Sequence, residues 1–114
     1  MLVVAAVLFA LAALGGIILA ALHLKKNDAP IPLALIHGLA AATGLVLLIV
    51  AVTQMPSAGL AGVALAIFVI AALGGFVLFA MHLAKKSLPR GLIFVHGLAA
   101  VVAFLLLLVS LLRG

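Results

Sequence analysis

The sequence predicts an all-α membrane protein, a four-transmembrane-helix bundle made of two tandem parallel helical-hairpin repeats. Three observations predict it. Hydrophobic residues make up 71% of the 114 positions and charged residues 6%, four apolar runs are long enough to span a bilayer, and the second half of the sequence matches the first. A water-soluble domain of this size could not bury so much apolar surface. The runs lack the alternating polarity of barrel strands, so helices are expected to satisfy the backbone in lipid.

The first hairpin is expected to consist of helices over about 2–24 and 31–52. The segment 25–30 separates them and ends in Pro30, a residue that is favoured at a helix start because its missing N–H needs no partner there. The first run lacks a preceding basic segment, and its apolar stretch is longer than that of a signal peptide. We therefore expect a retained transmembrane helix.

The second hairpin is expected to consist of helices over about 58–83 and 91–112. Pro56 lies in the connection between the hairpins, and Pro89 precedes the last helix. Each proline again lies close to the start of the next apolar run, where it is tolerated.

The two halves align without a gap at a shift of 59 residues, the separation of His23 and His82. Under that shift, matched His, Gly, Pro and Lys residues accompany the apolar ones. We expect a single domain over 1–114, with one repeat over about 1–54 and the other over about 55–114.

Basic residues lie mainly in the first and third loops. Five of the six Lys and Arg residues are found there, and Arg113 is the exception. The positive-inside rule predicts that loops 25–30 and 85–90 are cytoplasmic and that both termini lie outside. The expected location is a bacterial-type inner (cytoplasmic) membrane, crossed several times.

Four histidines flank these two loops: His23, His37, His82 and His96. At about 1.5 Å of rise per residue, all four are expected within roughly 10 Å of the cytoplasmic boundary, in one layer. His23 shares a helix face with Gly16, and His37 shares one with Gly44. Small residues favour helix contacts in membranes, so the imidazoles are expected to face the bundle interior.

The functional interpretation of these histidines is axial ligation of a tetrapyrrole. Neutral imidazole ligates iron, and two imidazoles facing each other across a bundle hold a haem. By analogy with the repeat, His37 is expected to pair with His96, the better pair, and His23 with His82. The second pair lies nearer the loops, where it would either hold a second macrocycle or only contact propionates, and pairing within one hairpin stays open. The expected ligands of the metal are His37, His96, His23 and His82. The expected cofactor contacts add Gly38, Gly97, Lys26, Lys85 and Arg90, the glycines as space and the cations as partners of propionates.

The histidine pattern, with His37-Gly38 and His96-Gly97 in particular, resembles that of four-helix transmembrane b-type cytochromes. The resemblance implies haem b and electron transfer with a quinone pool. The arrangement of histidines in this sequence departs from the respiratory cytochrome b pattern, in which two histidines share a helix and serve haems at opposite membrane faces. Here each predicted helix has one histidine, and all four lie near the same face.

Several alternatives remain at this level. Histidines near helix ends also serve as neutral hydrogen-bonding groups between helices, without any cofactor. The chain would then be an accessory subunit that packs against other membrane subunits or against copies of itself. A chlorophyll-type pigment would take one axial histidine, and four imidazoles could bind Zn or Cu. A small transporter or channel is least supported, because Thr43 and Ser110 are the only hydroxyls within the spans.

Composition excludes other classes of function. The chain has no cysteine and one acidic residue, Asp28, so thiol chemistry, paired carboxylates and a catalytic triad are absent. We do not expect an enzyme that acts alone, although the chain could be a redox subunit of an enzyme complex. A lipid-embedded chain offers no extended basic face for nucleic acid. The lack of Tyr and Trp argues against a quinone pocket of the usual aromatic kind.

Overall fold

The computed structural model describes residues 1–113 and is all-helical over that range. Its helices are α1 (Leu2–Leu24), α2 (Ile31–Thr53), α3 (Gly59–Leu83) and α4 (Arg90–Arg113). Each is long and apolar enough to cross a membrane, which confirms the predicted four-helix, multi-pass membrane protein. The observed ends lie within one residue of the expected ones. Gly114, the last position of the predicted second repeat, lies outside the described residues.

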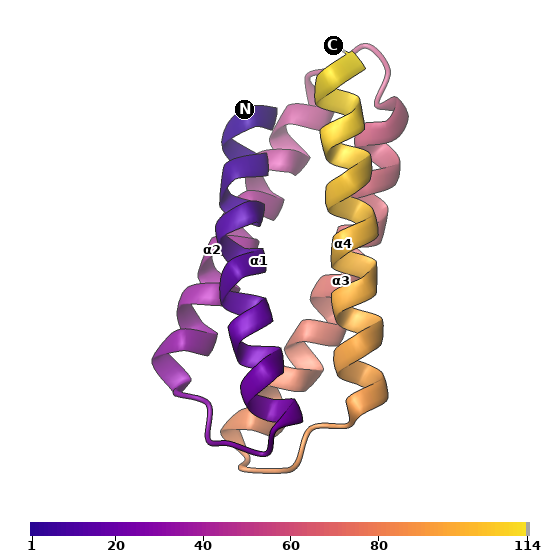
Figure 1. Cartoon of the computed structure of the whole chain (residues 1–114). Coiled ribbons are helices and arrows are strands. Elements are labelled where there is room, and N and C mark those ends of the chain that lie inside the picture. Colours follow the sequence, from indigo (N-terminus) through magenta and orange to yellow (C-terminus); the bar gives the residue numbers. More distant parts are fainter. Residues whose placement is uncertain (114) are drawn as a thin grey trace.

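The helices run up and down as two hairpins (Figure 1). Within a hairpin, α1 packs closely on α2 and α3 on α4, whereas the hairpins touch each other more sparsely, through α2 with α3 and α1 with α4. Helices α1 and α3 are therefore diagonal neighbours, and so are α2 and α4. The two termini lie at one end of the bundle, and the α1–α2 and α3–α4 loops lie at the other.

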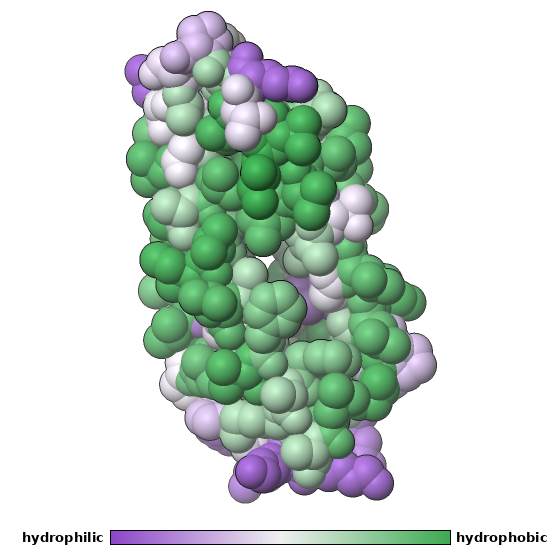
Figure 2. Space-filling model, turned by 180° about the vertical axis from the view of Figure 1, so that it is seen from behind, coloured by the Kyte–Doolittle hydropathy of each residue, from purple (hydrophilic) through white to green (hydrophobic). Residues whose placement is uncertain are grey.

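Small side chains form much of the bundle interior. Ala5, Ala64 and Ala103 are fully buried, and Leu48 and Leu107 are the largest fully buried side chains. Alanine brings helix backbones close together, which is how helices associate in lipid without a hydrophobic driving force between them. Large apolar side chains instead cover the outer surface, seen as the broad green band between hydrophilic ends in Figure 2.

One lysine just after the first helix of each hairpin has an unusual backbone conformation. Lys26 and Lys85 have φ of 58° and 57°, in the left-handed region where glycine is favoured and other residues cost roughly 1–2 kcal/mol. The amide that follows each lysine closes the helix, with Asn27 N–H donating to the Leu22 carbonyl at 2.9 Å. Lysine at this position places positive charge beside the carbonyl end of the helix, which the helix dipole favours.

Candidate functional site

A cavity of about 570 Å³ lies between the four helices, within the range of about 300–1,000 Å³ that is usual for cofactor and small-molecule sites. Among its lining residues, the polar side chains are the four imidazoles, and the others are aliphatic, phenyl or glycine. Figure 2 shows the apolar surface hollowed on the face opposite to that of Figure 1, with hydrophilic surface visible inside the hollow. The predicted inward orientation of the histidines is therefore observed.

His37 is held against α1 within its own hairpin. Its Nδ1 lies 2.7 Å from the carbonyl oxygen of Ala12. The ring lies close to Gly16, where an added Cβ would lie 2.9 Å from the ring carbon Cε1. Real Cβ atoms do not approach so closely, so the ring occupies space that exists because position 16 has no side chain.

His96 is held in the same way against α3. Its Nδ1 lies 2.7 Å from the carbonyl oxygen of Ala71, and a Cβ at Gly75 would lie 3.0 Å from its Cε1. Each hairpin thus contains one complete imidazole seat, made of a backbone carbonyl and a glycine on the first helix of the hairpin.

These hydrogen bonds determine the chemistry of the free ring nitrogens. A carbonyl oxygen only accepts, so Nδ1 of His37 and of His96 must carry the proton, and each neutral ring then presents Nε2 as a bare lone pair. Among residues 1–113, every side-chain nitrogen or oxygen that is fully enclosed has a hydrogen-bond partner. The unpartnered Nε2 atoms therefore reach open space. Two Lewis-basic nitrogens consequently share one apolar cavity.

The rings of His37 and His96 lie near each other across the α2–α4 diagonal. Their centroids are 6.3 Å apart and their planes are nearly perpendicular, at 85°. Both residues line the cavity, and both are partly buried.

His23 and His82 form a second, closer pair across the α1–α3 diagonal. Their ring centroids are 4.8 Å apart in an edge-to-face arrangement, and His82 Nε2 donates to the carbonyl oxygen of Ala29 at 2.9 Å. His37 is level with Gly16, seven residues from His23 on α1, which corresponds to about 10 Å along the axis. The imidazoles thus occupy two levels rather than the single layer that the sequence predicted.

The other predicted site residues are divided between the cavity and the loops. Gly38 and Gly97 line the cavity, and a Cβ at either would meet no atom within 4 Å. Lys26, Lys85 and Arg90 are exposed at the loop end. Arg90 Nη2 donates to the carbonyl oxygen of Leu24 at 3.4 Å, which links the start of α4 to the end of α1.

Sequence reasoning missed the carbonyls of Ala12 and Ala71 and the role of Gly16 and Gly75 as ring seats. The glycines did give a signal, because Gly15-Gly16 recurs as Gly74-Gly75 under the 59-residue shift. The carbonyls gave none, since every residue has one.

The four imidazoles do not converge on a single point. Within residues 1–113, no group of three or more His, Cys, Asp or Glu side chains is arranged to hold a metal ion. The histidines instead form two separate pairs, so the structure gives no support to a four-imidazole Zn or Cu site.

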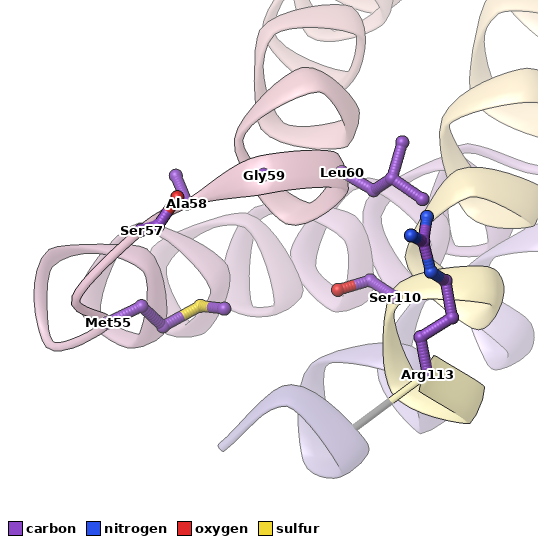
Figure 3. A pocket seen from close by; sticks show the side chains of 7 residues that line it. All are labelled: Met55, Ser57, Ala58, Gly59, Leu60, Ser110 and Arg113. Atoms are coloured by element: carbon purple, nitrogen blue, oxygen red, sulfur yellow. The ribbon is translucent and has the colours of Figure 1, made fainter.

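A second pocket, of about 450 Å³, lies at the opposite end of the bundle (Figure 3). It lies between the start of α3 and the end of α4, from which Ser110 and Arg113 project. Ser57 and the two residues from α4 supply its polar groups. On α2, Thr43 donates to the Leu39 carbonyl at 2.8 Å, as expected for a self-satisfied helix hydroxyl, and Thr53, which the observed helix includes, donates to the Val50 carbonyl at 2.6 Å.

Comparison with known proteins adds no identity: no protein-family model, no curated protein sequence and no solved structure matches this chain.

Proposed function

We propose that this chain is a small membrane protein that holds a tetrapyrrole, haem b, between His37 and His96 and serves as an electron-transfer subunit of a larger membrane complex. One observation carries the proposal. Two imidazoles oppose each other in an apolar cavity, each with Nδ1 bonded to a backbone carbonyl and Nε2 left free. Metal-ligating histidines characteristically donate their second ring N–H to such an acceptor, which fixes the tautomer and the ring orientation.

The separation of the rings fits this role. An imidazole–metal bond is about 2 Å long and a ring nitrogen lies about 1 Å from its centroid, so two axial imidazoles need centroids about 6 Å apart. The observed separation of His37 and His96 is 6.3 Å. For His23 and His82 it is 4.8 Å, and His82 Nε2 is already bonded to Ala29. We therefore assign ligation to His37 and His96.

The surroundings of this pair support the same assignment. A flat macrocycle needs room beside its ligands, and Gly16 and Gly75 contribute no side chain there. When bound, haem would supply a one-electron carrier. The protein would contribute the two ligands, exclude water with its apolar lining, and set the electrostatics of the site.

A ligand with two axial positions is favoured over the alternatives. A chlorophyll-type pigment takes one imidazole and would leave the other Nε2 without a partner in the cavity. A purely structural role would leave both Nε2 atoms exposed to the open cavity without a ligand. The accessory subunit without a cofactor is the second candidate, and the extensive lipid-facing apolar surface suits it as well.

We also propose which molecules contact the outer surface of this chain. The exposed apolar side chains contact lipid, other membrane subunits or a second copy of this chain. If the chain binds haem, a quinone is the electron-exchange partner that we propose. Quinones dissolve in the bilayer, and the cavity opens on the apolar outer surface.

The experiment that tests the function is an absorption spectrum of the purified protein before and after dithionite, followed by titration with haemin. We expect the low-spin spectrum of a bis-imidazole haem, with a stoichiometry of one per chain. A spectrum without haem bands, together with no binding of added haemin, would leave the accessory-subunit function in its place.

We also propose that the loops 25–30 and 85–90 are cytoplasmic and that both termini lie outside. The chain has no cysteine, so single Ser57→Cys and Ser87→Cys variants are matched reporters at the two ends of the bundle. Both serines are exposed. In spheroplasts, an impermeant maleimide should label the variant at position 57 and leave that at position 87 unlabelled until lysis. The reverse pattern would invert the topology.

A further inference from the structure

We infer that the cavity takes one planar ligand in a single orientation, with an anionic edge directed at His23 and His82 and an apolar edge at Phe9 and Phe68. The inference rests on the proposed tetrapyrrole function and makes it more specific. It assigns the ring N–H of His23 to recognition of the carboxylates of the ligand, with His82 bonded to Ala29 beside it, and assigns neither residue to metal ligation.

The two diagonal helices define the height of the cavity. On α1, Phe9, Gly16 and His23 follow one another at intervals of seven residues, which places them on one face and about 10 Å apart along the axis. On α3, the same spacing relates Phe68, Gly75 and His82. The His37–His96 pair is level with the two glycines. The ligand is therefore bounded by phenyl rings on one side and by imidazoles on the other.

The phenyl boundary is closed and apolar. Phe9 and Phe68 stack with centroids 3.8 Å apart and planes within 5° of parallel, and each ring residue is 6% exposed. The cavity lining near them offers no hydrogen-bond donor among its side chains. An unneutralised carboxylate at this end would be costly, because charges transferred into apolar surroundings lose their hydration.

The end of the cavity at His23 and His82 is polar and lies next to positively charged loops. His23 and His82 line the cavity, and the loops that follow their helices carry Lys25, Lys26, Lys85 and Lys86, all exposed. His82 already donates its Nε2–H to the Ala29 carbonyl. The ring N–H left for an outside acceptor is that of His23, which lies in edge-to-face contact with His82 and bonds no other residue in the described range 1–113. A carboxylate would find charge-assisted hydrogen bonds and favourable charge only at this end.

The closeness of His23 and His82 also limits the number of ligands to one. Rings 4.8 Å apart in edge-to-face contact leave no room for a second macrocycle between them. The ligand class is therefore a metal tetrapyrrole with free carboxylates along one edge, as opposed to a fully esterified one.

The test compares haemin with its dimethyl ester, which has the same iron and ring but no carboxylates. We expect the wild type to bind haemin about tenfold or more tightly than the ester, since hydrogen bonds to charged groups contribute on this scale. In a His23→Ala/His82→Ala double variant this preference should fall to about twofold or less. Its low-spin spectrum should stay unchanged, which shows that the fold and the His37–His96 ligation persist.

A Phe9→Leu variant is the control for general damage to the cavity, and it should weaken haemin and the ester by the same factor. A His23→Gln/His82→Gln variant, which keeps neutral hydrogen-bond donors, should recover part of the preference. An undiminished preference in the alanine double variant, or two haemins bound per chain, overturns this inference alone. Failure of the wild type to bind haemin overturns it together with the proposed function.

Discussion

Replacing His37 or His96 with alanine should abolish the low-spin bis-imidazole spectrum and lower the affinity for haemin by about 100-fold or more. Each variant removes one of the two unbonded Nε2 atoms that belong to the ring pair across the α2–α4 diagonal. The remaining imidazole keeps its own seat, because the hydrogen bonds to Ala12 and Ala71 lie in separate hairpins. We therefore expect each single variant to give a high-spin, five-coordinate spectrum, measured by absorption and electron paramagnetic resonance.

Added imidazole provides a specific rescue for these two variants. The alanine leaves a space the size of the lost ring, and free imidazole entering it should restore the low-spin spectrum. Thr43→Ala is the control on α2, since this exposed hydroxyl bonds the Leu39 carbonyl and does not line the cavity. If both histidine variants keep the wild-type spectrum, His37 and His96 are not the ligands.

The fold was predictable from local features. Unbroken apolar runs identify helices in lipid because no other open structure satisfies its backbone there. Pro30 and Pro89 mark the places where two of them begin. The diagonal placement of His37 and His96 also agrees with the expectation from the 59-residue shift.

The seats of the rings were less predictable. Whether Nδ1 of His37 meets the Ala12 carbonyl depends on how far α2 slides along α1, and small side chains permit many such registers. The single histidine layer failed for a simpler reason. A ring near the end of α1 and a ring at the seventh position of α2 differ in depth by about 10 Å, so His37 and His96 lie deeper in the bundle than His23 and His82.

The glycines that seat the rings give the second large effect. Gly16→Ala and Gly75→Ala should each lower haemin affinity by about 10- to 100-fold, the usual consequence of disturbing the groups that orient a metal ligand. The added Cβ would lie 2.9 Å from Cε1 of His37 or 3.0 Å from that of His96. The ring would have to shift by a few tenths of an ångström, which strains its 2.7 Å hydrogen bond to the carbonyl of Ala12 or Ala71 and turns Nε2 away from its position in the cavity. Haemin titration followed by absorption measures the effect.

Adjacent glycines supply a matched control for this prediction. At Gly15 and Gly74 the nearest atom to an added Cβ is the Cβ of His37 or His96, at 3.5 and 3.7 Å, which is ordinary van der Waals contact. Gly15→Ala and Gly74→Ala should therefore change haemin affinity less than about threefold. All four substitutions raise helix propensity by about 1 kcal/mol, so a loss confined to positions 16 and 75 cannot come from a weakened helix. Equal losses at all four positions would show that these glycines serve close helix packing and that the rings are not seated by them.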